Sequence, residues 1–212
     1  MPSPTSHYFD SDPTGPAHTR TLRVNLAGRD IEITSADGVF SGDRLDPGTS
    51  VLLRGVPHPP TGGTFLDIGC GWGPIACTLG MLSPEADVIA VDVNRRSREL
   101  TATNAAALGC TRVQALAPEE VPEEARFDLI WSNPPIRIGK PALHALLLTW
   151  LPRLSPGADA YLVVSKNLGA DSLQTWLTAT LPDAFTVRRA ATAKGFRILH
   201  VHRDSETDTA YS

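Results

Sequence analysis

The sequence predicts one α/β domain whose central sheet is mostly parallel, with an antiparallel β-hairpin at its end and a second hairpin near the start of the chain. The chain has 212 residues, 42% of them hydrophobic and 20% charged, which suits one domain with a sizeable core. Short apolar segments alternate with helical ones between residues 64 and 180. That pattern is typical of a parallel sheet covered on both faces. The last two apolar segments are joined only by residues 191–195, too few for a helical crossover.

The segment before the sheet predicts a β-hairpin and a short helix. Apolar residues alternate with polar ones through 22–26 and again through 31–33, on either side of a turn at Ala27-Gly28-Arg29. Asp46 suits a helix N-cap and Pro47 the first helical position, so we expect a helix that ends near Arg54.

The sheet and its helices follow in order. We expect strands at 64–68, 87–91, 112–115, 127–132 and 159–164, and helices at 74–83, 95–108, 140–153 and 169–180. The final strands, 184–190 and 196–202, should pair antiparallel. The proline-rich residues 1–19 predict a disordered arm, and the polar residues 204–212 predict a disordered tail. A single domain is therefore expected over 20–203.

Composition limits the kinds of protein that this chain can be. Its net charge is −4, so any contact with nucleic acid must be local. The cysteines Cys70, Cys77 and Cys110 form no CxxC pair, which argues against a disulfide framework or a metal site and favours a cytoplasmic protein. The longest apolar run, 143–151, is too short to cross a membrane, and the first residues lack the apolar core of a signal peptide.

A glycine-rich turn follows the strand at 64–68. Gly69, Gly71 and Gly73 can adopt positive φ and allow a ligand to approach the backbone at the start of a helix. The next strand ends in Asp92, 23 residues after Gly69, and an acid there suits a ribose diol. The spacing is GxGxG, whereas a nicotinamide dinucleotide site usually has GxGxxG.

Asn133-Pro134-Pro135-Ile136 follows the strand at 127–132. The two prolines stiffen the segment, so that the side-chain carbonyl of Asn133 and the backbone carbonyl of Pro134 can accept from one planar amine. Methyl transfer to an exocyclic amine or an amide nitrogen requires such a grip. A proline-rich turn whose asparagine caps the next helix is the alternative, and the glycine turn with Asp92 favours the first interpretation.

With these motifs in order, the chain resembles the methyltransferase small family of S-adenosylmethionine-dependent enzymes. It is similar to the catalytic domain of ribosomal RNA guanine-N2 methyltransferases over about residues 20–203. The matching segments are 38–41, 45–49, 66–75, 92–94, 104–105, 132–140 and 194–199. The resemblance implies a class I methyltransferase (Rossmann-like) sheet, with the N-terminal β-hairpin as an extension. It also implies S-adenosyl-L-methionine as cofactor and methylation of an exocyclic amine, guanine N2 of ribosomal RNA above all.

The resemblance also implies roles for single residues. Cofactor contacts are expected from Asp67, Gly69, Cys70, Gly71, Gly73, Asp92, Val93, Asn94, Leu116 and Asn133. Asp67 would accept from the methionine ammonium and Asp92 from the ribose. Relatives often place Asp or Asn after the third strand for the adenine amine; here the segment 114–119 reads QALAPE, so we expect the adenine to meet backbone at 115–117. The catalytic segment is Asn133, Pro134, Pro135 and Ile136, with Asn133 as an acceptor and not a base.

Substrate contacts are expected from Phe40 and from a set of basic residues, Arg137, Lys140, Arg188, Arg189, Lys194 and Arg197. The segment 184–202 has no acid and suits RNA phosphates; alternatively, its cations keep an edge strand from pairing with other sheets. Relatives often stack an aromatic side chain on the base where this chain has Ile136, so an apolar contact or another aromatic must substitute. Methylation of a protein glutamine or a small-molecule amine stays open, as does a non-catalytic module of an RNA complex.

Overall fold

The computed structural model describes residues 18–205. The arm expected at 1–19 and the tail expected at 204–212 lie almost wholly outside the described residues. Thr19, at the end of the expected arm, already belongs to the first strand.

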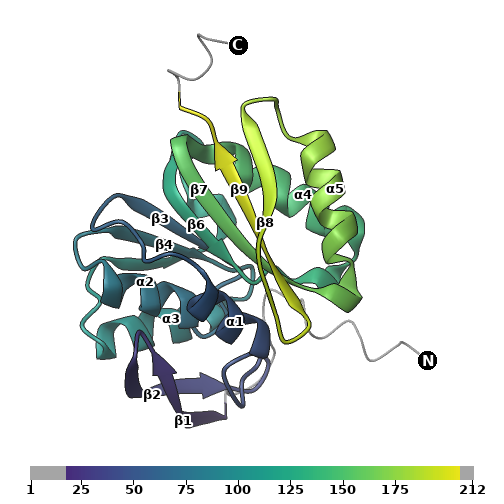
Figure 1. The fold of residues 1–212 in the computed structure, drawn as a ribbon. Helices are drawn as coiled ribbons and strands as arrows, with labels where there is room; N and C mark the ends of the chain where they lie inside the picture. The colour runs from purple at the N-terminus through teal and green to yellow at the C-terminus, as the bar shows by residue number, and fades with distance from the viewer. Residues whose placement is uncertain (1–17, 206–212) are drawn as a thin grey trace.

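A seven-stranded sheet forms the centre of the molecule, in the order β5-β4-β3-β6-β7-β9-β8 (Figure 1). The first five strands in that order are parallel, β9 is antiparallel to β7, and β8 is antiparallel to β9. Their bounds are β3 Thr64–Ile68, β4 Asp87–Val91, β5 Val113–Leu116, β6 Phe127–Ser132, β7 Leu154–Ser165, β8 Phe185–Ala193 and β9 Phe196–Arg203. The predicted fold class is confirmed.

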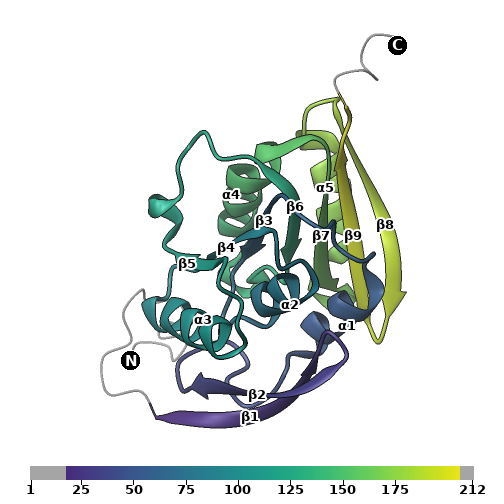
Figure 2. The ribbon, with the colours of Figure 1, turned by 90° about the vertical axis from the view of Figure 1, so that its left-hand side faces the viewer.

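Helices cover both faces of this sheet, as Figure 2 shows. One face carries α1 (Pro47–Gly55), α2 (Pro74–Leu82) and α3 (Arg95–Ala107), and the other carries α4 (Lys140–Trp150) and α5 (Ala170–Thr180). A separate apolar cluster fills each side, one around Leu52 and Phe65, the other around Leu147 and Trp150. Burial on both faces explains why Phe65 and Leu66 of β3 are both apolar although successive residues face opposite sides of the sheet.

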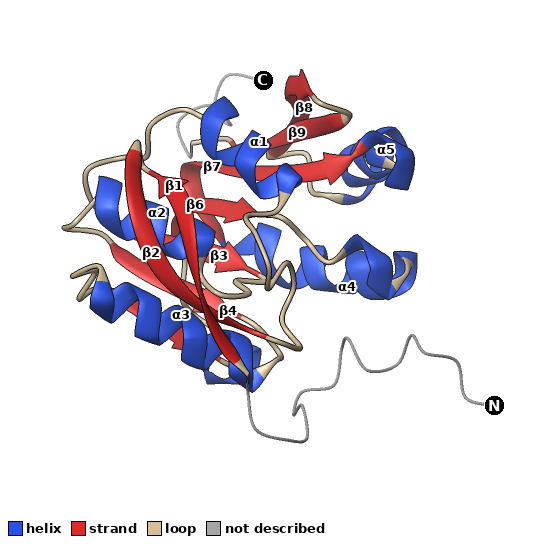
Figure 3. Cartoon of the chain, turned by 90° about the horizontal axis from the view of Figure 1, so that it is seen from below, coloured by secondary structure: helices blue, strands red, loops and turns tan. Residues whose placement is uncertain are grey.

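The N-terminal hairpin is a two-stranded sheet of its own, made of β1 (Thr19–Leu26) and β2 (Arg29–Ala36). It crosses the outer side of α2 and α3 (Figure 3). The side chain of Asn104 on α3 joins it to the domain, accepting from Thr34 N at 2.7 Å and donating to Thr34 O at 2.8 Å. The same amide donates to Trp72 O at 2.8 Å, so one side chain holds the hairpin and the glycine turn together.

The C-terminal hairpin is longer than its sequence suggests. The expected loop 191–195 is wrong, because β8 continues to Ala193 and only Lys194 and Gly195 form the turn. Both adopt positive φ, 49° and 79°, as a tight two-residue hairpin turn requires. An irregularity between Arg189 and Ala191 shifts the register of the pair, and this shift hides the alternation from sequence reasoning.

Candidate active site

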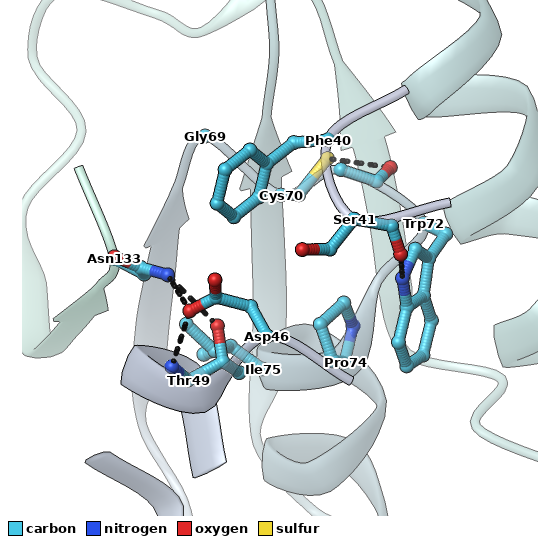
Figure 4. Close-up of a pocket in the computed structure, with 11 residues that line it drawn as sticks. Phe40, Ser41, Asp46, Thr49, Gly69, Cys70, Trp72, Pro74, Ile75 and Asn133 are labelled. Atoms are coloured by element: carbon cyan, nitrogen blue, oxygen red, sulfur yellow. Dashed lines mark hydrogen bonds between the residues drawn. The ribbon is translucent and has the colours of Figure 1, made fainter. Parts of the chain in front are cut away.

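The carboxyl ends of β3, β4 and β6 meet at one edge of the sheet, where ligands of open α/β sheets bind. A small pocket opens there, between the glycine turn and the segment that leads into α1 (Figure 4). It is lined by Phe40, Ser41, Asp46, Thr49, Gly69, Cys70, Gly71, Trp72, Pro74, Ile75 and Asn133. Five of the predicted site residues are thus brought together: Phe40, Gly69, Cys70, Gly71 and Asn133.

The glycine turn has the positive-φ backbone that its sequence predicts. Gly69, Gly71 and Gly73 adopt φ of 77°, 58° and 93°. The amides of Gly69 and Cys70 both donate to Val91 O, at 2.8 and 3.1 Å, so the turn is fixed to the neighbouring strand. A Cβ at Gly73 would lie 3.0–3.1 Å from Thr101, so a side chain there would force Thr101 to move. Trp72, within this turn, is only 1% exposed.

Asp92 supports the same turn from the end of β4. Its carboxylate accepts from Gly71 N at 3.0 Å and from Asn94 N at 2.9 Å. Burial raises the pKa of Asp92, while these two backbone amides act in the opposite direction. Each carboxylate oxygen has a second lone-pair direction, so the group keeps capacity for hydroxyl donors.

Asp67 lies fully buried at the carboxyl end of β3. One carboxylate oxygen accepts from Ala76 N at 3.1 Å, and the other, Oδ1, has no partner among the described residues. Burial raises the pKa of Asp67 to about 8. A buried carboxyl with an unsatisfied oxygen favours a cationic donor, because pairing offsets the cost of its charge.

Asn133 projects into the pocket from the end of β6. Its Nδ2 donates to Asp46 Oδ1 at 2.8 Å and lies 3.0 Å from Thr49 Oγ1 (Figure 4). The side-chain carbonyl of Asn133 therefore remains as its free acceptor. The alternative role of this asparagine, capping the next helix, is not what the structure shows, since Gly139 occupies the N-cap of α4.

The residues that follow Asn133 form a compact turn. Pro134 O already accepts from Ile136 N at 2.8 Å, which leaves one lone pair of this carbonyl for an amine. Ile136 packs against the apolar cluster beneath α4, so it is directed into the domain. Phe40 is 45% exposed at the pocket and offers an aromatic side chain in its place.

The predicted adenine contacts lie along the same edge but outside the enclosed pocket. Val93 is 51% exposed and Leu116 is half-buried, and Asp92 N donates to Leu116 O at 3.4 Å. The side chain of Asn94 is engaged elsewhere: it caps α3 through Ser97 N and donates to Gly38 O. Asn94 therefore anchors the segment that carries Phe40, and no cofactor contact is proposed for its side chain.

The predicted cations separate into two groups. Arg137 and Lys140 follow Asn133 at the carboxyl edge, and Lys194 lies in the β8–β9 turn, where Gly195 O accepts from Lys166 N. Arg188 and Arg189 lie on the edge strand β8, which is separated from β6 by β7 and β9. Because successive residues of a strand face opposite sides, these two arginines point to opposite faces of the sheet. Arg197 is 8% exposed and paired with Asp171, so it is unsuited to contact RNA.

Three residues make contacts at the site that the sequence alone did not predict. Asp46 and Thr49 hold Asn133, and Lys166 joins Lys194 at the end of β7. The helix-capping spacing of Asp46 and Thr49 was visible in the sequence. Their contacts with Asn133, which is 87 positions after Asp46 and 84 after Thr49, were not visible in the sequence.

One group of metal-binding residue types occurs among the described residues, Asp159, His200 and His202. Arg188 Nε donates to His200 Nδ1 at 2.8 Å, which leaves the ring proton on Nε2, 2.5 Å from Asp159 Oδ1. A metal would have to displace that proton beside a guanidinium. The expected absence of a metal stays a prediction. No helix within residues 18–205 is long and apolar enough to span a membrane.

Comparisons with known proteins agree with this geometry. Residues 30–200 match the model of the methyltransferase small domain. The chain is 30% identical to YbxB of Bacillus subtilis, described only as uncharacterized, over 92% of this chain and 97% of that protein. It is 38% identical to ribosomal RNA small subunit methyltransferase C of Serratia proteamaculans, but that match covers 52% of this chain and 31% of the relative.

A solved structure resembles the whole described fold. It is the 16S rRNA N2 methyltransferase RsmC of T. thermophilus in complex with AdoMet and guanosine, with a TM-score of 0.75 and 27% identity. The match covers 90% of this chain and 52% of that one, so this chain spans about half the length of that relative.

These features define a methyltransferase of the Rossmann-like class: a mostly parallel sheet with helices on both faces, a glycine turn after β3, an acid after β4 and Asn-Pro-Pro after β6. The chain belongs to the methyltransferase small domain family. The predicted enzyme class and its methyl donor, S-adenosylmethionine, are confirmed at the level of the family.

Proposed function

We propose that this protein methylates an exocyclic amine of RNA, guanine N2 of ribosomal RNA, with S-adenosylmethionine as the donor. The observation that carries the proposal is the fixed amide of Asn133, whose nitrogen is held by Asp46 and Thr49 and whose carbonyl is left for an amine. A protein glutamine or a small amine would fit the same acceptor. The relatives named for ribosomal RNA favour the nucleobase.

The residues at the carboxyl ends of β3, β4 and β5, beside the pocket, fit S-adenosylmethionine. The unpartnered Oδ1 of Asp67 suits the ammonium of its methionine part, and Asp92 suits its ribose hydroxyls. The exposed Val93 and the half-buried Leu116 provide apolar surface for the adenine. When bound, the cofactor supplies a methyl group on a positively charged sulfur, from which an amine can displace it.

The chain itself has mainly to orient the amine, because orientation alone lowers a barrier by several kcal/mol. Asn133 accepts one amine N–H through its side-chain carbonyl, and Pro134 O has a lone pair left for the other. The amine lone pair then points to the methyl group. As the new C–N bond forms, the amine becomes strongly acidic. Its proton then leaves to water, so no base is required. Phe40, exposed at the pocket, takes the stacking role that Ile136 cannot fill.

The RNA contact surface in this proposal is the set Arg137, Lys140, Lys166 and Lys194, all at the carboxyl edge of the sheet. Ribosomal RNA as partner agrees with the cytoplasmic location expected from the cysteines. The single domain expected over 20–203 belongs to the same proposal: one unit that holds both ligands.

Incubation with radiolabelled S-adenosylmethionine and ribosomal RNA, followed by nucleoside mass spectrometry, tests this function. We expect N2-methylguanosine from the wild-type protein and at least a 100-fold slower rate from Asn133→Ala, since misplacement of a reacting group costs about that much. Calorimetry should show that Asn133→Ala loses far less S-adenosylmethionine affinity than rate. Labelled protein or small amine without labelled RNA would overturn the RNA assignment.

Salt dependence tests the RNA surface. Each lost phosphate contact lowers the logarithmic slope by about 0.7 for single strands, so Arg137→Glu with Lys140→Glu should lower it by about 1.4. Arg126→Glu is the matched control, an exposed arginine at the opposite end of β6. Equal slopes for all three proteins would contradict the assigned surface.

A further inference from the structure

We infer that Asp46 and Thr49 are positioning residues that fix the amide of Asn133 in the one orientation that can receive the amine. The inference rests on the proposed function and adds to it residues outside the glycine turn and the Asn-Pro-Pro segment.

The hydrogen bonds allow only one orientation of the amide. Asn133 Nδ2 lies 2.8 Å from Asp46 Oδ1 and 3.0 Å from Thr49 Oγ1, so both of its N–H groups have an acceptor. A flipped amide would place its carbonyl oxygen at the same distance from a carboxylate oxygen, and two acceptors repel each other. The flip would also direct two donors at the incoming amine, which is itself a donor.

The two positioning residues belong to a rigid element. Asp46 is the N-cap of α1 and accepts from Thr49 N at 2.9 Å with the same Oδ1 that holds Asn133. Thr49 is 3% exposed, and α1 packs on β7 and β9 through Val51 and Leu52. Because α1 is fixed on β7 and β9, its first residues hold Asn133 in a fixed position at the end of β6.

The charge of Asp46 also serves the reaction. A carboxylate beside the amide nitrogen draws positive charge toward that end and leaves the carbonyl oxygen of Asn133 more negative. The amine becomes positive as it takes the methyl group, so the strengthened acceptor stabilises the transition state more than the ground state. This effect is lost in a variant that keeps the shape of the site but not its charge.

Two substitutions separate this role from helix capping. Serine caps helices about as well as aspartate, so Asp46→Ser keeps the cap but is too short to hold Asn133. Thr49→Val keeps the buried shape and removes the oxygen. We expect kcat to fall about 10- to 100-fold for Asp46→Ser and less for Thr49→Val, with KM for both ligands little changed. In an Asn133→Ala background, Asp46→Ser should lower kcat no further.

A measurement without substrate tests the same point. With ¹⁵N-labelled asparagine, the side-chain NH2 of Asn133 should give two separate signals that exchange slowly with water. In Asp46→Ser the chemical shifts of these two signals should approach each other, and both protons should exchange faster with water. The Asn133→Ala protein identifies the signals by their absence.

The outcomes distinguish the two proposals. If the wild-type protein methylates no RNA while the NH2 signals behave as expected, the proposed function fails and the fixed amide stands. Unchanged NH2 signals in Asp46→Ser would overturn the positioning role. An S-adenosylmethionine affinity that falls in proportion to kcat would also overturn it, because Asp46 would then act on the cofactor. Additive losses of kcat in the variant that combines Asp46→Ser with Asn133→Ala would overturn it as well.

Discussion

Substitution of Asn104 by alanine should weaken the whole fold and the cofactor site together. Asn104 is 1% exposed and makes three hydrogen bonds, two to the backbone of Thr34 in β2 and one to Trp72 O in the glycine turn. Alanine removes all three and leaves the three backbone groups without these partners.

The size of the effect follows from these contacts. Each of the three hydrogen bonds contributes about 1 kcal/mol net, and the two groups of Thr34 are only part-buried, so water can replace the lost partner there. The loss should therefore be about 3–4 kcal/mol of unfolding free energy. For a domain of this length, about 2–4 °C of Tm is lost per kcal/mol, which gives a fall of about 6–16 °C. S-adenosylmethionine affinity should fall too, because the carbonyl of Trp72 no longer fixes the glycine turn.

Thermal and urea unfolding followed by circular dichroism measure the loss. Asn25→Ala is the matched control, since Asn25 makes one exposed side-chain hydrogen bond, to Asp30, and should change stability by less than about 0.5 kcal/mol. A Tm for Asn104→Ala equal to that of Asn25→Ala would refute the claim that this side chain joins the hairpin to the domain.

Two further predictions concern the glycine turn and Asp67. Gly73→Ala should destabilise the protein by about 1–3 kcal/mol more than Gly69→Ala: both sites have positive φ, but a Cβ at Gly73 meets Thr101 at 3.0 Å whereas one at Gly69 has only a 3.6 Å contact with Pro135. Equal unfolding midpoints in urea would count against this steric explanation. Because the folded pKa of Asp67, about 8, lies above its ordinary 3.8, the folded protein holds an extra proton between these values, and stability should fall as pH rises from about 4 to about 8. Asp67→Asn should remove that fall in a Tm-against-pH series, and parallel curves for the two proteins would show that Asp67 is ionised in the folded state.

The order of elements was readable from the sequence because each is encoded locally. Apolar runs such as Thr64–Ile68 define buried parallel strands, and Asp46-Pro47 defines the start of α1. The glycine turn and the acid after β4 were equally plain, since positive φ and a position at a strand end are properties of a few neighbouring residues.

The features that the sequence did not show have a common physical cause, which is contact between distant segments. Nothing near Arg197 in the sequence shows that it faces Asp171 on α5, and nothing near Asn94 shows that its amide reaches Gly38. The partnership of Asn133 with α1 is of the same kind. In β8, the irregularity between Arg189 and Ala191 displaced the alternation on which strand prediction depends.

The central claim is that this chain methylates guanine N2 in ribosomal RNA through an amine held by Asn133. Its most direct test is nucleoside mass spectrometry of ribosomal RNA from cells that lack the gene, complemented with the wild-type or the Asn133→Ala protein. We predict that N2-methylguanosine at one position disappears with the gene, returns with the wild-type protein and stays absent with Asn133→Ala. Ribosomal RNA with the same modifications in all three strains would contradict it.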